Sequence, residues 1–160
     1  MADGTNEIRS TLNNLIETLK DGEEGFRGSA EKLQSAALRG QFQSYSSQRG
    51  RFASELQSQV AGLGGKPETS GSTAGAIHRG WIGLKSAIAG SDDHAILEEA
   101  ERGEDSAVKN YREAMAKDLP RDIHAVIEGQ YRDVLATHNQ VKALRDGIAT
   151  VGSGQSERTW

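Results

Sequence analysis

The stretch "LRGQFQSYSSQRGRFASELQSQVAGL", residues 38–63, carries a large side chain at every third or fourth position along its whole length. The members of this stripe are Leu38, Phe42, Tyr45, Arg49, Phe52, Leu56, Val60 and Leu63. Steps of three and four residues place side chains on one face of an α-helix. The stretch therefore predicts a long bundle helix whose seam contains one permanently charged residue, Arg49.

The same helical period continues on both sides of this stretch, and the only two prolines, Pro67 and Pro120, fall where the pattern stops. Residues 8–33 predict one long helix, kinked near residues 21–22. A third helix is predicted from a cap at Ser91 or Asp92 to about Lys117, and a fourth from near Pro120. The residues expected to line one continuous core include Leu15, Leu19, Phe42, Phe52, Leu56, Val134 and Val141.

A loop-like segment separates the second and third predicted helices. The segment "GLGGKPETSGSTAG", residues 62–75, is rich in glycine and contains a proline. It is followed by "AIHRGWIGLKSAIAG", residues 76–90, which predicts a short amphipathic helix with Trp81 as a packing anchor. Such a connection is long enough to cross the bundle, as in ferritin-like bundles. We therefore predict an all-α, ferritin-like four-helix bundle with a crossover that carries a short extra helix between helices 2 and 3.

Length and composition restrict the class of protein further. The 160 residues predict a single domain over 1–150, followed by a disordered tail over 151–160. With 19 Lys and Arg against 23 Asp and Glu, the net charge is -4, and no basic stripe for nucleic acid is present. The chain has no cysteine, which excludes thiolate metal sites and thiol nucleophiles. The absence of a signal-like N-terminus or a long apolar run predicts a cytoplasmic protein without membrane contact.

Four spaced motifs resemble a bacterial family: "LNNLIETLKDGEEGF", "SQRGRFASELQSQV", "HRGWIGLKSAI" and "LEEAERGEDSAVKNY". Together they are similar to the ferritin-like four-helix-bundle proteins described as a domain of unknown function, over about residues 5–147. The resemblance implies the fold and a loose association with bacterial stress responses. It does not imply an established reaction.

A ferritin-like di-iron centre needs a Glu from each of two helices and a Glu-x-x-His pair from each of the other two. No Glu-x-x-His occurs in this chain. We therefore predict no metal and no cofactor. The alternative is a degenerate metal site, for which the candidate ligands are Glu23, Glu104, Glu128 and His138.

The predicted seams instead turn polar at mid-height, at Glu23, Arg49, Glu104, Gln130 and Tyr131. A guanidinium cannot ligate a metal and competes with one for carboxylates, so this set predicts a polar core layer with an inward salt bridge from Glu104. The remaining carboxylates near Glu104, which are Glu98, Glu99, Glu101 and Asp105, are expected to face water. His138 is expected to be a core or edge histidine, and His94 and His124 to be exposed.

No catalytic constellation is visible, because the four histidines are scattered and no nucleophile is paired with one of them. The sequence therefore favours a non-enzymatic helical bundle that acts through its surface or its oligomer in bacterial stress adaptation. The alternative is a metal-binding ferritin-like protein with a degenerate di-iron or di-manganese site. Expected partners are a second copy of the chain, as a possible homodimer, or an unknown protein.

Overall fold

The computed structural model describes residues 2–71, Trp81 and residues 92–154. This part of the chain contains four helices and no strand: α1 (Ala2–Lys32), α2 (Ala36–Gly62), α3 (Asp93–Met115) and α4 (Arg121–Gly154). The predicted all-α four-helix bundle is therefore confirmed. Helix α4 extends to Gly154, into the predicted tail, and the rest of that tail lies outside the described residues. The predicted short helix over residues 76–90 lies outside the described residues, apart from Trp81.

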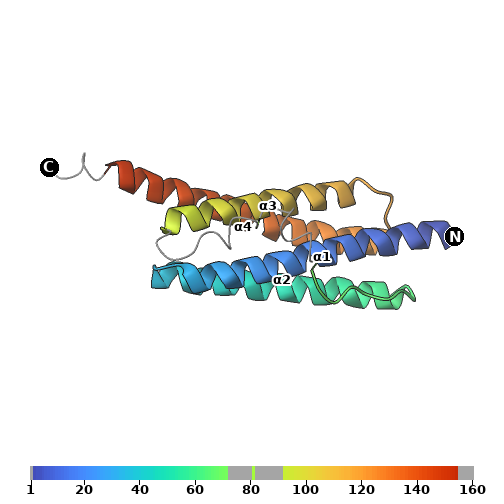
Figure 1. Ribbon diagram of the computed structural model, residues 1–160. Helices are drawn as coiled ribbons and strands as arrows, with labels where there is room; N and C mark the ends of the chain where they lie inside the picture. The colour runs from blue at the N-terminus through green and yellow to red at the C-terminus, as the bar shows by residue number, and fades with distance from the viewer. Residues whose placement is uncertain (1, 72–80, 82–91, 155–160) are drawn as a thin grey trace.

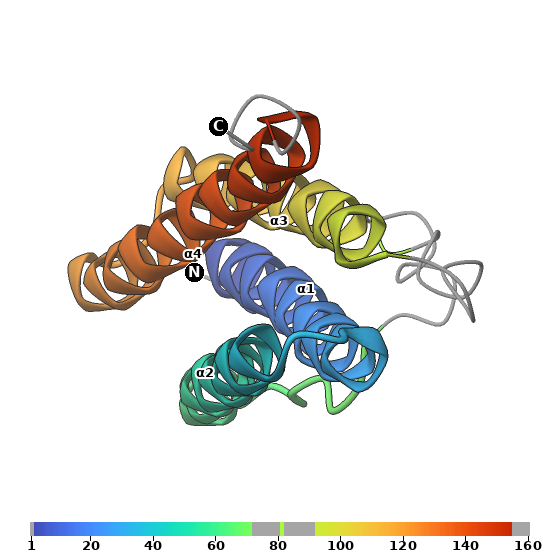
Figure 2. The same cartoon turned by 90° about the vertical axis from the view of Figure 1, so that its left-hand side faces the viewer.

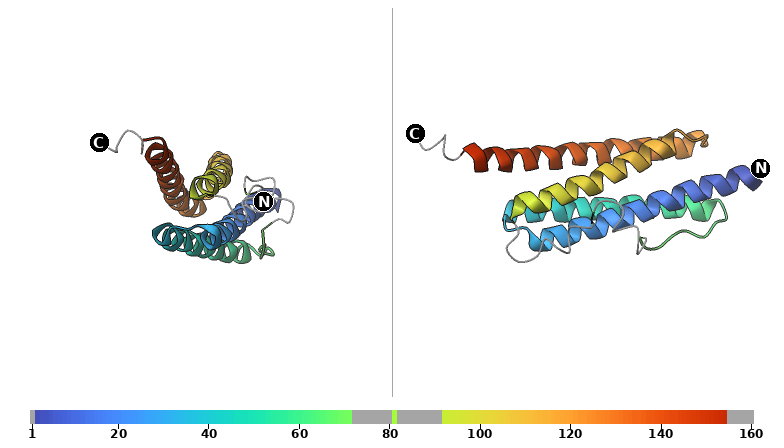
Figure 3. Two further views of the ribbon diagram at one scale, coloured as in Figure 1. Left: turned by 60° about the vertical axis from the view of Figure 1, so that its left-hand side comes forward. Right: turned by 45° about the horizontal axis from the view of Figure 1, so that its top comes forward.

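The bundle consists of two antiparallel helix pairs (Figure 1). Helix α1 packs mainly against α2, and α3 packs mainly against α4. Seen from the end, α1 lies beside both α2 and α3, whereas α2 and α4 diverge and touch at few positions (Figure 2). Helix α2 ends at the opposite end of the bundle from the start of α3, so these two helices run parallel and the connection between them is a crossover (Figure 3).

Side-chain caps explain where two of the helices begin. The Ser35 hydroxyl accepts a hydrogen bond from the Leu38 amide at 3.2 Å, and the Asp92 carboxylate accepts one from the Ala95 amide at 2.9 Å. Asp93 then ties the two helix pairs together, because its carboxylate accepts hydrogen bonds from the backbone amides of Gln34 and Ser35 at 2.8 and 3.1 Å. The start of α3 is thus held against the α1–α2 turn.

The apolar core is divided into two clusters along the length of the bundle. The cluster nearer the chain's N-terminus is built around Leu12, Leu15, Ile16, Leu19, Ala53, Leu56, Val60, Tyr111, Ile127 and Val134. The other is built around Phe26, Leu33, Phe42, Trp81, Ile96, Leu97 and Val141. Every residue expected in the core is buried except Phe52, which is half-buried and packs on the first cluster. One continuous core was therefore the wrong expectation, and polar residues lie between the two parts.

Trp81 packs into a slot made by two helical glycines. A Cβ atom at Gly25 on α1 or at Gly103 on α3 would overlap the Trp81 indole. The indole is only 6% exposed and meets the Phe26 ring edge-on, with centroids 5.2 Å apart. The expected role of Trp81 as a packing anchor is thus confirmed. The two glycines are needed because the aromatic ring passes directly against the helix backbones.

Within the described residues, no helix is both long enough and apolar enough to cross a membrane.

Candidate functional site at the bundle centre

A buried ion pair joins α2 to α3 at the level where the two core clusters meet. Arg49 Nη1 donates to Glu104 Oε2 at 2.6 Å, and Arg49 Nη2 donates to Glu104 Oε1 at 2.5 Å. The side chains are 1% and 0% exposed, respectively. Two parallel N–H···O bonds of this kind fix the orientation of both groups, because the planar guanidinium matches the planar carboxylate. We refer to Arg49 and Glu104 as the central pair.

The surroundings of Arg49 are shaped to admit a guanidinium. A Cβ atom at Gly22 on α1 would lie 3.4 Å from Arg49 Nη1, so the glycine leaves room for the charged group beside the helix backbone. The Phe26 ring lies on another side, with its centroid 5.2 Å from Arg49 Cζ, which is cation–π geometry. Arg49 Nε, by contrast, has no hydrogen-bond partner among the described residues. The site therefore stabilises the positive charge mainly through Glu104.

A second polar group lies next to the central pair and links α3, α4 and α2. The Tyr111 hydroxyl donates to Gln130 Oε1 at 2.7 Å. Gln130 Nε2 in turn donates to the Phe52 carbonyl and to Glu55 Oε1, both at 3.3 Å. Because Tyr111 is fully buried, desolvation raises the pKa of its hydroxyl far above the usual value; Arg49 lowers this pKa and Glu104 raises it, both more weakly. Tyr111 is consequently a neutral hydrogen-bond donor at physiological pH.

Two of the residues predicted for the polar layer have polar partners other than the central pair. Glu23 is half-buried and forms an ion pair with Lys20, one turn earlier on α1, at 3.1 Å. Tyr131 is also half-buried, and its hydroxyl accepts a hydrogen bond from Arg112 at 2.9 Å. The buried layer is thus formed by Arg49, Glu104 and Gln130 of the predicted set, together with Tyr111.

The alternative metal ligands are held at separate places. Glu104 is bound to Arg49, whereas Glu128 lies on the outer face of α4 and bonds Arg132 of the same helix at 2.5 Å. His138 contacts Asp105 across the α3–α4 interface, with Nε2 2.5 Å from Oδ1. Glu23, as described above, pairs with Lys20. The four candidates therefore do not form one donor set.

The expectation that the neighbours of Glu104 face water was wrong for one carboxylate. Glu99 is only 8% exposed and pairs with Arg102, one turn away on the same helix. Asp105 is exposed, whereas Glu98 and Glu101 are half-buried. The sequence does not single out Tyr111, because an aromatic residue in an apolar stripe is typical of a hydrophobic seam. For the slot that holds Trp81, the sequence signal was the presence of Gly25 and Gly103 within helices.

Comparison with known proteins places the chain in a family. Residues 7–117 match the model of the family described as Domain of unknown function (DUF2383). The chain belongs to this DUF2383 family. The matched residues span α2 and α3 completely. They include the central pair, and also Gly22 and Tyr111. A comparison with curated proteins finds no match to the DUF2383 chain.

Solved structures show that the fold is ferritin-like. The first is a two-domain protein from Anabaena variabilis that contains DJ-1/ThiJ/PfpI-like and ferritin-like domains; it is 19% identical, with a TM-score of 0.73 over 90% of the DUF2383 chain. The chain spans 40% of that protein's length. The second is a dodecameric thioferritin, a bacterioferritin-related protein from Bacteroides fragilis, with 14% sequence identity and a TM-score of 0.69. The match covers 98% of the DUF2383 chain and 92% of the thioferritin chain.

The residues at the centre of this DUF2383 chain do not fit the di-metal group that its fold suggests. A ferritin-like di-iron centre is built from four Glu and two His side chains that project inward. Among the described residues, the central layer offers one fully buried carboxylate, Glu104, which is already bound at both oxygens by a guanidinium. The other groups are the Gln130 amide and the neutral Tyr111 hydroxyl. This set suits the guanidinium of Arg49 and not two metal ions.

Proposed function

We propose that this DUF2383 protein is a non-enzymatic, cytoplasmic helical bundle that acts through its surface or through self-association. One observation carries the proposal: Arg49 takes both carboxylate oxygens of Glu104 at the bundle centre. A cation that is part of the chain cannot be exchanged, reduced or oxidised as a metal ion can. The buried layer then serves to fix how the helices pack, which is a recognised use of buried ionic groups.

The geometry of the layer supports such a role in helix register. Arg49 can form both hydrogen bonds to Glu104 only when α2 and α3 are correctly aligned along their axes. The Tyr111–Gln130 hydrogen bond applies the same requirement to α3 and α4. A displacement of one turn in either pair would leave buried polar groups without partners, which is energetically costly. The layer therefore selects one arrangement of the four helices.

Self-association is supported by the fold and by one exposed surface. The dodecameric thioferritin shows that a bundle of this fold can assemble. In this chain Ala36, Ala37 and Gly40 are exposed at the start of α2, and such small side chains allow another helix to approach closely. The proposed role in bacterial stress adaptation rests on the family resemblance alone.

Sedimentation equilibrium on the untagged protein over a wide concentration range tests self-association. We expect a mass above that of the 17.2 kDa chain at the higher concentrations. Replacing Ala37 with a bulky charged residue, as in Ala37→Glu, is expected to weaken the association. Replacing exposed Gln43, further along α2, with Glu is the matched control. A monomer at every concentration would exclude the homodimer, leaving a different protein as the partner.

A further inference from the structure

Three side chains with metal-binding atoms meet on the outer side of the α3–α4 pair: Glu101, Asp105 and His138, here called the edge cluster. One donor atom from each lies within 4.8 Å of the donor atoms of the other two. Glu101 and Asp105 are four residues apart on α3 and so share a face of that helix. His138 reaches them from α4. The cluster is separate from the central pair, since Asp105 is 62% exposed whereas Glu104 is fully buried.

The imidazole of His138 has an oxygen atom next to each of its nitrogens. Nε2 lies 2.5 Å from Asp105 Oδ1, and Nδ1 lies 3.2 Å from Asn139 Oδ1. A neutral imidazole carries one proton, so only one of these contacts can be a hydrogen bond donated by the ring. A neutral ring can donate from Nε2 to Asp105 and accept at Nδ1 from a turned Asn139 amide, or Nε2 can bind a cation beside the Asp105 carboxylate. The experiment below distinguishes these two possibilities.

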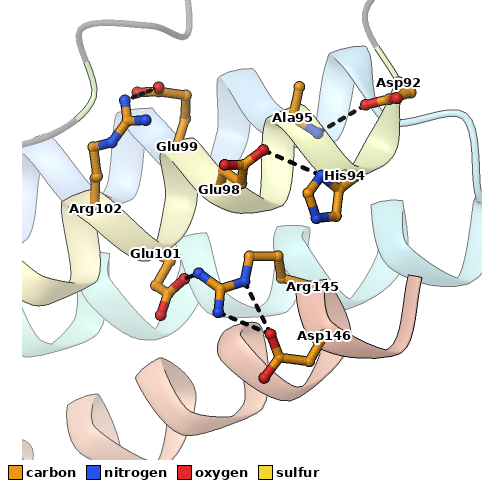
Figure 4. A network of polar contacts seen from close by, with 9 residues as sticks. All are labelled: Asp92, His94, Ala95, Glu98, Glu99, Glu101, Arg102, Arg145 and Asp146. Atoms are coloured by element: carbon orange, nitrogen blue, oxygen red, sulfur yellow. Dashed lines mark hydrogen bonds and ion pairs between the residues drawn. The ribbon is translucent and has the colours of Figure 1, made fainter. Parts of the chain in front are cut away.

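Two carboxylates at this edge share one cation, Arg145. Arg145 on α4 bonds Glu101 across the helix pair and also bonds Asp146 at 2.8 Å (Figure 4). Arg145 also pairs with Asp146, so the guanidinium keeps an ion-pair partner if Glu101 rotates to bind a metal ion.

Space for a hydrated ion lies directly beside the cluster. Asp105 and His138 form part of the wall of a groove of about 400 Å³ between α3 and α4, whose other charged lining residues are Lys109, Arg112 and Glu113. The groove is open to solvent, because Asp105 is itself exposed. A metal bound by three protein ligands needs such space for the water molecules that complete its coordination, and it needs a path of entry.

We propose that the edge cluster binds one divalent transition-metal ion, with Zn²⁺ as the representative, between α3 and α4. An imidazole nitrogen with two carboxylate oxygens suits Zn²⁺ and similar first-row ions, whereas Mg²⁺ and Ca²⁺ prefer oxygen ligands alone. Donors around one tetrahedral ion lie about 3.4 Å apart. The 2.5 Å between His138 Nε2 and Asp105 Oδ1 must therefore widen, and any wider spacing in the cluster, up to 4.8 Å, must shorten, through side-chain rotations of Glu101 and Asp105. This inference goes beyond the proposed function, because the bound ion would join two helices at a place remote from the bundle centre.

Isothermal titration calorimetry with ZnCl₂ tests the site, using the full-length untagged protein after treatment with a chelator. We expect binding of one Zn²⁺ per chain in buffer of physiological ionic strength. Asp105→Asn and His138→Ala are each expected to weaken binding on the order of tenfold or more, because each removes one of three ligands. Arg145→Gln is expected to strengthen binding, because it removes the cation that competes for Glu101.

His124→Ala is the matched control. His124 lies on α4 like His138 and has a carboxylate neighbour, Glu128, at 3.6 Å, but no third ligand among the described residues joins this pair. Its replacement is expected to leave the Zn²⁺ affinity unchanged, and circular dichroism confirms that each variant is folded. The proposal is overturned if no Zn²⁺ binds, if binding is weak and to many sites, or if binding is equally strong in the folded His138→Ala variant. These results would assign the His138 contacts to hydrogen bonds within the chain.

Discussion

Replacing one member of the central pair should cost far more stability than replacing both. The single variants are Arg49→Met and Glu104→Leu, and the third protein carries both changes. Each single change leaves a fully buried charge without its partner, since the side chains are 1% and 0% exposed. Two unit charges about 4 Å apart interact with about 4 kcal/mol at an effective dielectric constant of about 20. Each single variant is therefore expected to lose about 3–5 kcal/mol, the range found when a buried pair is broken.

The double variant should lie within about 1 kcal/mol of the natural protein, or exceed its stability. Both charged side chains are replaced by apolar ones, so no charge remains to be desolvated. Urea unfolding followed by far-ultraviolet circular dichroism at neutral pH measures all four proteins. The exposed pair of Arg132 and Glu128 is the control, because Arg132→Met should cost about 1 kcal/mol or less.

Additive losses in this mutant cycle, within about 0.5 kcal/mol, would mean that Arg49 and Glu104 do not interact in solution. A loss below about 1 kcal/mol in each single variant would lead to the same conclusion, because burying an unpaired charge costs much more free energy than that. Either result would remove the basis for assigning the bundle centre to an ion pair.

Two further predictions concern the slot for Trp81 and the buried tyrosine. Gly103→Ala should destabilise the protein by about 1–3 kcal/mol, because the added methyl group overlaps the Trp81 indole. At Gly129 on α4, where a Cβ meets nothing within 4 Å, the same change should stabilise by about 0.5–1 kcal/mol in urea unfolding. Burial raises the pKa of Tyr111, so above pH 10 the unfolded chain loses a proton that the folded chain keeps, and stability should fall as the pH rises. Absorbance at 295 nm should show Tyr111 ionising only together with unfolding, and its ionisation in the folded protein near pH 10 would contradict its burial.

The helices were predictable from the sequence because their apolar stripes are regular and their caps are local signals. The prediction for α3 identified Asp92 as a possible cap, and the structure uses it. An inward Glu104 was also predictable, because the seams of both α2 and α3 become polar at the same height. In each case the information lies within one helix or in a comparison of two seams.

The other contacts depend on how the helices are rotated about their axes, which no single stripe determines. Trp81 meets Gly25 and Gly103 only because the crossover brings it between α1 and α3. Asp105 and His138 are 33 residues apart, and each belongs to a pattern that is typical of a water-facing or edge position. Their contact follows from the packing of α3 on α4, so the edge cluster could not be assembled from the sequence.

The measurement that tests the central claim most directly is addition of Fe(II) to the untagged protein in air, with iron content and oxygen uptake recorded together. An ion pair at the bundle centre predicts no oxygen uptake above the buffer blank. It also predicts that any bound metal is limited to the edge cluster and is lost in His138→Ala. Binding of two Fe(II) per chain, with oxygen consumption that Glu104→Gln abolishes, would show a di-iron centre and contradict the account.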